Sequence, residues 1–350
     1  MSPKIRPHTV LITGGAGFIG SRLIRRFFLK YPDVHVICLD ALTYAGNRKN
    51  LADIPKASRL IFVKGDITDA PLVRRVYKKY RPDLVINCAA ETHVDRSIHG
   101  AADAFVRTNV LGTTVLLRAL LDAPFVKKYV QVSTDEVYGS LTLASKKAFT
   151  ESSPLAPNSP YAGSKAAGDL LARSFFKTYG LPIVITRCSN NYGPYQYPEK
   201  FIPFSIFRLM QSKPLTLYGD GNYIRDWIHV NDHADALILA SGSGVPGEIY
   251  NIGASDEVSN LDLARSILTY FGKDESMLSF VADRLGHDRR YAIDSNKIRH
   301  DLGWKPSHSF RKSLPETIGW YVDNQRWVDD ALKRNGLANQ HIVSEDKDAV

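Results

Sequence analysis

Two carboxylates stand side by side in the stretch QVSTDEVYGS, residues 131–140, directly after an apolar run. Most loops carry Gly, Ser or Asn at such a place, so Asp135 and Glu136 are unusual there. Adjacent carboxylates repel each other, and the repulsion raises the pKa of one of them. Two acids whose pKa values are driven apart can serve as a general acid and a general base. The alternative is a solvated turn, and the surrounding fold must decide between the two interpretations.

A tyrosine and a lysine four residues apart form a second chemical pair. They are Tyr161 and Lys165 in SPYAGSKAAGDLLARSF, where a helix is expected to begin, so both lie on one helix face. A free phenol has a pKa near 10, and a nearby ammonium favours the phenolate. Tyr161 could then take a proton from a sugar hydroxyl whose carbon gives up a hydride. An exposed Tyr and a surface Lys are the alternative, because this spacing is common.

A glycine-rich turn, LITGGAGFIGS, follows the first apolar run and opens a helix. Gly15, Gly17 and Gly20 match G-x-G-x-x-G, the turn that brings backbone N–H groups against a pyrophosphate. Asp40 ends the next strand, about 20 residues on, where a carboxylate can accept a hydrogen bond from a ribose 2′-OH and repel a 2′-phosphate. This context predicts a dinucleotide site that prefers NAD to NADP, rather than a purely structural glycine turn.

The strands and helices expected to position these groups alternate regularly along the chain. Short apolar runs such as TVLIT, VHVICLD, DLVINCAA and KYVQVST read as buried strands, and amphipathic segments lie between them. This pattern predicts an α/β fold: a Rossmann-type doubly wound parallel sheet with a smaller, mixed α/β C-terminal lobe. We expect an NAD-binding domain over residues 1–190, to which residues 225–255 return. Residues 191–224 and 256–335 would form the substrate lobe, and residues 336–350 a solvated tail.

Composition narrows the class of partner. The 350-residue chain is 44% hydrophobic and 23% charged, with a net charge of +9. Its Lys and Arg residues are scattered, which favours a small anionic ligand over nucleic acid. The three cysteines have no metal-ligand spacing, so we expect no metal site and a reducing compartment. We also expect no signal peptide and no stretch long enough to span a bilayer, hence a cytoplasmic protein.

The glycine and tyrosine motifs, in this order, resemble the short-chain dehydrogenase/reductase superfamily, and the chain length resembles its extended, nucleotide-sugar branch. The likeness runs from about Thr9 to Pro306. STDEVYG resembles the nucleotide-sugar 4,6-dehydratases, whereas epimerases usually carry non-acidic residues there. LDALTYAGN, AAETHVDRSI, RCSNNYGPYQYPEKFIP, IRDWIHVNDH and RLGHDRRYAID resemble the dTDP-glucose 4,6-dehydratases in particular.

The resemblance implies a role for each acid. Once the sugar C4 hydroxyl is oxidised to a ketone, Glu136 would remove the C5 proton and Asp135 would protonate the departing C6 hydroxyl. Hydride would return to C6, so that tightly bound NAD is regenerated in each turnover. Thr134 would hydrogen-bond the C4 oxygen, and Tyr161 and Lys165 complete the catalytic set.

The resemblance also implies ligand contacts and a partner. A homodimer would form through helices near residues 101–121 and 161–179, which make a four-helix bundle. The substrate would contact Thr92, Thr134, Asn190, Arg225, Asn260, Arg284 and His287. The cofactor would contact Gly14, Gly17, Phe18, Ile19, Gly20, Asp40, Leu42, Thr43, Asp66, Ile67, Ala89, Ala90, Glu91, Thr108, Tyr161, Lys165 and Asn191.

Three alternatives stay open at this point. UDP-glucose could replace dTDP-glucose, because a few pocket contacts decide the base. The same fold supports epimerases and decarboxylases, although the acid pair disfavours them. A nucleotide-sugar-binding regulator without activity is the third, disfavoured because all five chemical groups are present.

Overall fold

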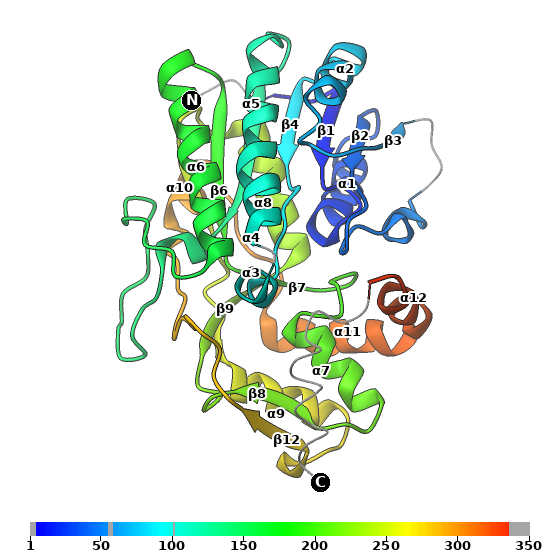
Figure 1. The fold of residues 1–350 in the computed structure, drawn as a ribbon, viewed down its shortest axis with the longest axis vertical. Coiled ribbons are helices and arrows are strands. Elements are labelled where there is room, and N and C mark those ends of the chain that lie inside the picture. The colour runs from blue at the N-terminus through cyan, green and yellow to red at the C-terminus, as the bar shows by residue number, and fades with distance from the viewer. Residues whose placement is uncertain (1–4, 55–58, 101, 336–350) are drawn as a thin grey trace.

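The computed structural model describes residues 5–54, 59–100 and 102–335. Its centre is a seven-stranded parallel sheet with the order β10-β6-β5-β4-β1-β2-β3 (Figure 1). This order is the doubly wound arrangement of dinucleotide-binding domains with one strand added at the β6 edge. The predicted fold class is therefore confirmed. The strands are β1 (Thr9–Thr13), β2 (His35–Asp40), β3 (Leu60–Lys64), β4 (Leu84–Asn87), β5 (Lys128–Thr134), β6 (Ile183–Cys188) and β10 (Ile249–Ile252).

Helices cover both faces of this sheet, which explains why its strands read as nearly continuous apolar runs. One hydrophobic core lies under α1 (Phe18–Lys30), α8 (Val230–Ser243) and α10 (Asn296–Leu302). The other lies under α2 (Ala70–Tyr80), α5 (Thr113–Leu121) and α6 (Pro160–Tyr179). Since all seven strands run parallel, their carboxyl ends meet at one edge, where ligands bind in such sheets.

The smaller lobe lies beyond that edge and carries two small sheets, β11-β9-β7 and β12-β8 (Figure 1). The chain enters it after β6, and α8 and β10 lie back in the layers of the large sheet, whereas β9 pairs within the lobe. The remaining elements are η1 (Arg48–Leu51), α3 (Val94–His99), α4 (Ala102–Phe105), the π-helical η2 (Val106–Gly112), η3 (Asp135–Tyr138), β7 (Asn190–Tyr192), α7 (Phe201–Met210), β8 (Leu215–Tyr218), β9 (Ile224–His229), β11 (Glu257–Ser259), α9 (Asn260–Tyr270), η4 (Glu275–Met277), β12 (Leu278–Val281), α11 (Phe310–Asp323) and α12 (Gln325–Asn335).

The sequence analysis expected no stretch long enough to span a bilayer, and this expectation needs correction. The helical stretch Ala102–Leu121 has 20 residues and a mean hydropathy of 1.3, so by length and composition it could cross a membrane. A packed helix of a globular protein meets the same criterion, and α5 packs against α2 and α6. Only 44% of the most apolar 18-residue window in this stretch is buried, which leaves apolar surface to be explained. The predicted tail, residues 336–350, lies outside the described residues.

Candidate active site

The glycine turn after β1 forms a cradle that no larger side chain would fit. Gly14 has a φ of +65°, a conformation that favours glycine. A Cβ atom on Gly20 would lie 2.2 Å from the Gly14 carbonyl oxygen, so α1 can approach the turn only without one. The α1 helix starts at Phe18 and directs its first N–H groups toward the turn. A pyrophosphate fits the donors that such a turn presents.

Asp40 lies at the end of β2 and links this turn to the next loop. Its two carboxylate oxygens accept hydrogen bonds from the Ala16 N–H (2.9 Å) and the Leu42 N–H (2.7 Å). Burial raises the pKa of Asp40, while these two hydrogen bonds favour the carboxylate and lower it. Each oxygen keeps a lone pair for a ribose hydroxyl. Asp40 and the glycine turn therefore fit NAD.

A single cavity joins this cradle to the acid pair. Of the predicted cofactor residues, Leu42 alone does not line it; Leu42 instead adopts a φ of +56° beside Asp40. The cavity also contains the predicted catalytic side chains and three predicted substrate contacts, Thr92, Thr134 and Asn190. Among the described residues there is no group of three His, Cys, Asp or Glu side chains that could hold a metal ion.

The acid pair begins η3, directly after β5. Thr134 ends the strand, and its hydroxyl accepts a hydrogen bond from the Glu136 N–H (3.3 Å), which fixes the turn. Asp135 is buried, and among the described residues its Oδ2 atom has no hydrogen-bond partner. Burial, then Glu136 and Asp226, raise the pKa of Asp135 well above its usual range. Asp135 is therefore suited to hold a proton.

Glu136 shares Arg225 with Asp135 as a charged neighbour, but more cations surround it. Burial raises its pKa, and the cations of Arg284, Lys200 and Arg225 oppose that rise. These positive charges favour the carboxylate, which is the form a base requires. The surroundings of the two adjacent acids therefore favour a protonated Asp135, the proton donor, and an ionised Glu136, the proton acceptor.

The tyrosine–lysine pair is positioned by the start of α6. The Ser159 hydroxyl caps this helix by accepting the Ala162 N–H (3.1 Å), so Tyr161 lies in the first turn and Lys165 one turn later. The Lys165 ammonium donates to the Val132 carbonyl oxygen on β5 (2.7 Å). Both side chains reach the cavity.

The surroundings of Tyr161 favour its neutral phenol. Burial, and then the charges of Glu136, Cys188 and Asp135, raise the pKa of Tyr161 well above its ordinary value. A hydrogen bond with Thr134 lowers it, and Lys165 is not among the groups that shift it. The Lys165 ammonium is held against the β5 backbone, and its effect on the phenol stays a prediction.

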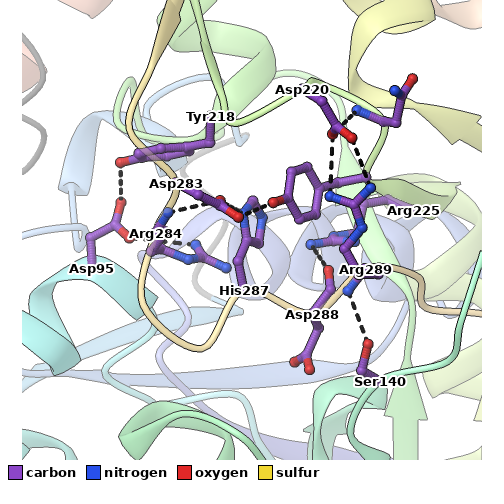
Figure 2. A network of polar contacts seen from close by, with 12 residues as sticks. Asp95, Ser140, Tyr218, Asp220, Arg225, Asp283, Arg284, His287, Asp288 and Arg289 are labelled. Carbon is purple, nitrogen blue, oxygen red and sulfur yellow. Dashed lines mark hydrogen bonds and ion pairs between the residues drawn. The ribbon is translucent and has the colours of Figure 1, made fainter.

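Four predicted substrate residues lie outside the cavity, and three of them, Arg225, Arg284 and His287, belong to the polar network of Figure 2. Arg284 Nη1 is 3.4 Å from Asp95 Oδ1, and the ring of His287 stacks on Tyr223 with centroids 3.6 Å apart. Asp283 accepts from Tyr223 and pairs with His287 Nδ1 (2.8 Å). These contacts hold the loop that carries Arg284 and His287 against the lobe.

The other two residues belong to the smaller lobe, one on strand β9 and one at the start of α9. Arg225 is buried; it donates to the Asp288 carbonyl oxygen (2.9 Å) and lies 4.3 Å over the Tyr291 ring. Burial lowers its pKa, and Glu136 is among the groups that raise it. Asn260 begins α9, and its N–H donates to the Tyr223 carbonyl oxygen (2.9 Å). The network thus adjoins the acid pair through Arg225 and Arg284.

Comparisons with known proteins agree with this geometry. The chain matches a family model described as GDP-mannose 4,6 dehydratase over residues 11–317. It is 47% identical over 341 residues to a dTDP-glucose 4,6-dehydratase of Xanthomonas campestris pv. campestris (strain B100), with 93% of this chain and 96% of that one covered. The chain belongs to the dTDP-glucose 4,6-dehydratase family. The predicted resemblance is confirmed.

Solved structures separate this family from others of the same fold. The dTDP-glucose 4,6-dehydratase DesIV of Streptomyces venezuelae, solved with NAD bound, is 50% identical and has a TM-score of 0.88 over 92% of this chain and 99% of that one. A UDP-glucose 4-epimerase of Thermotoga maritima is similar in fold, with a TM-score of 0.83 over 91% of this chain and 99% of that one, but is only 28% identical. The epimerase alternative is therefore disfavoured.

Sequence reasoning missed several cavity residues. Lys200 donates from Nζ to the Thr92 carbonyl oxygen (3.0 Å) and is one of the cations that lower the pKa of Glu136. Glu199 is almost fully buried, which raises its pKa to about 7. Gln196, Tyr197 and Phe201 line the same wall. The signal was present, because YQYPEKF belongs to a stretch already noted for its resemblance, but no role could be given to single residues there.

Proposed function

We propose that the protein is an NAD-dependent dTDP-glucose 4,6-dehydratase, a hydro-lyase that converts dTDP-α-D-glucose to dTDP-4-keto-6-deoxy-D-glucose. The observation that carries this proposal is the acid pair Asp135–Glu136, which opens into the same cavity as Tyr161 and the dinucleotide cradle. NAD, when bound, accepts the hydride from sugar C4 and returns a hydride to C6. An epimerase, a decarboxylase or an inactive binding protein would not require a protonated acid next to an ionised one.

Each side chain has one task in this reaction. Thr134 and Tyr161 bind the C4 oxygen, and Tyr161 takes the hydroxyl proton as the ketone forms. Glu136, as the carboxylate, removes the proton from C5, which the neighbouring ketone makes acidic. Asp135, as the neutral acid, protonates the C6 hydroxyl so that it leaves as water. As hydride reaches C6, C5 regains a proton from the protonated Glu136. Burial raises the pKa of both acids. Negative neighbours raise that of Asp135 further, whereas cations oppose the rise at Glu136, and this difference supports the division.

The nucleotide diphosphate lies, in this proposal, along the network of Figure 2. The guanidinium groups of Arg225 and Arg284 suit a diphosphate, which planar donors recognise well. Asn190 reaches the sugar-diphosphate junction, and Asn260 and His287 contact the nucleoside. Most of residues 1–190, with α8 and β10, would form the NAD-binding domain. Strand β9, with most of residues 191–224 and 256–335, would form the lobe for the nucleotide sugar.

We further propose a homodimer formed through η2, α5 and α6. Their outer surface carries apolar side chains, of which Val106 is 56% exposed, Leu111 47%, Leu121 42% and Leu170 55%. Clustered exposed apolar groups mark association surfaces. A second copy covering this surface also accounts for the incomplete burial of Ala102–Leu121. The proposed location is the cytoplasm, where nucleotide sugars are available.

The function is tested by incubating pure protein with dTDP-glucose and measuring the product mass, with UDP-glucose assayed side by side. We expect loss of one water and a C6 methyl signal in the NMR spectrum. A product of unchanged mass with an inverted C4 centre would favour an epimerase instead. Faster turnover of UDP-glucose would reassign the base, and absence of any turnover would favour a binding protein.

A further inference from the structure

Three consecutive hydrogen bonds join the last described helix to the glycine turn. The indole N–H of Trp327, on α12, donates to Asn50 Oδ1 (2.9 Å). The Asn50 amide nitrogen donates to the Ala16 carbonyl oxygen (2.9 Å), and the Ala16 N–H donates to Asp40 Oδ2 (2.9 Å). Trp327 and Asn50 are 277 residues apart in the chain. The C-terminal helix thus reaches both features that fit the dinucleotide.

Asn50 is the centre of this series. It is 1% exposed, so water cannot replace either contact of its side chain. Its backbone carbonyl accepts from Arg25 (2.7 Å), and its N–H donates to the Asn47 carbonyl oxygen (2.9 Å). The Asn47 N–H also donates to the Ala16 carbonyl oxygen (3.0 Å). Removing the Trp327 donor would therefore leave a buried amide oxygen unpaired, which is costly.

Helix α12 packs on the core of the smaller lobe and makes a further contact with the NAD-binding domain. Val328 and Ala331 are buried, and the Trp327 ring packs edge-on against Tyr195 with centroids 5.7 Å apart. An ion pair joins Lys49 to Asp330. Figure 1 shows α12 next to α11, below the loop that follows β2. The charge of Arg334, in the last turn of α12, also lowers the pKa of Asp40.

We propose that Trp327 and Asn50 are positioning residues that hold the glycine turn ready for NAD and slow the release of NAD. This inference rests on the proposed function. In that reaction the reduced cofactor must stay bound until hydride returns to the sugar, so release between the two transfers would abandon the substrate half-converted. A turn already held in its binding form also binds more tightly, because no binding energy is lost in ordering it.

The test measures NAD affinity and NAD release rather than turnover. Trp327→Phe removes the donor and keeps an aromatic ring. Trp320→Phe is the matched control, because Trp320 packs in the same cluster, 5.4 Å from Trp327 between centroids, but no hydrogen bond joins its indole to the described part of the NAD-binding domain. Full-length protein is titrated with NAD by calorimetry. Release from loaded protein is followed by the NAD retained after removal of free nucleotide.

We expect Trp327→Phe to raise both Kd and release rate about 5- to 30-fold, the loss that one buried hydrogen bond corresponds to, and Trp320→Phe to change each less than about twofold. Asn50→Ala should weaken NAD binding at least as much, and the double variant should be no weaker than Asn50→Ala alone. Asn50→Ala alone decides whether the contact to the glycine turn matters if Trp327→Phe does not fold: an unchanged Kd for NAD would overturn the inference.

Other results would overturn the inference. Trp327→Phe with a Kd within twofold of wild type would remove its role, and an equal loss in Trp320→Phe would assign the effect to general packing of α11 and α12. Fully additive losses in the double variant would separate Trp327 from Asn50. Wild-type protein that does not bind NAD at all would overturn the proposed function together with this inference, whereas variant-specific results concern the inference alone.

Discussion

At the scale of single residues, the positive charges around Glu136 set the pH at which it can act. Arg284 is foremost among the cations that lower the pKa of Glu136. Arg284→Gln should raise that pKa, so that Glu136 stays protonated to higher pH. The ascending limb of the profile of kcat against pH should therefore move to higher pH, measured with saturating dTDP-glucose between about pH 5 and 9. Arg289→Gln is the control, because Arg289 pairs with Asp220 and is not among the groups that shift Glu136.

Asp135 is the second residue whose role can be isolated by a single change. Asp135→Asn keeps the size of the side chain but removes the proton that the C6 hydroxyl requires. We expect kcat to fall about 10²- to 10⁴-fold. Binding of dTDP, measured by calorimetry, should change less than about threefold because the carboxyl does not contact the nucleotide in the proposal. Turnover close to that of wild type would remove Asp135 from the acid role.

At the scale of elements, a buried ion pair attaches α6, the helix of Tyr161 and Lys165, to strand β6. Arg187 Nε lies 2.9 Å from Asp169 Oδ2, and the side chains are 4% and 1% exposed. Asp169→Asn should lower the free energy of unfolding by about 3 kcal/mol, because it leaves a buried guanidinium without its counter-charge. Urea unfolding followed by circular dichroism measures this loss. The double variant Asp169→Leu, Arg187→Met should recover part of it, and a single variant as stable as wild type would contradict the argument.

The elements also show what the sequence could predict. The large sheet, the glycine turn, Asp40 and the acid pair were predicted because each depends on neighbours within a short stretch of chain. The lobe was predicted only in outline, since its strands are three to six residues long and pair across distant segments. Lys200 was missed because only the fold brings it to Thr92. The altered pKa of Tyr161 depends on burial, which no spacing of residues reveals.

At the scale of the whole molecule, the exposed apolar surface on η2, α5 and α6 leads to a prediction about assembly. Leu170 is 55% exposed in the middle of α6, and Leu29 is 72% exposed on α1, away from that surface. A charge at a buried interface would be desolvated without a partner, so Leu170→Glu should dissociate the proposed homodimer, whereas Leu29→Glu should leave it intact. Light scattering after size-exclusion chromatography gives the mass of each variant; one chain has a mass of 39.0 kDa.

Because α6 also carries Tyr161 and Lys165, the monomer should lose activity as α6 loses its support. A Leu170→Glu protein that stays dimeric would place the interface on another surface. A wild type that is monomeric at micromolar concentration would rule out the homodimer.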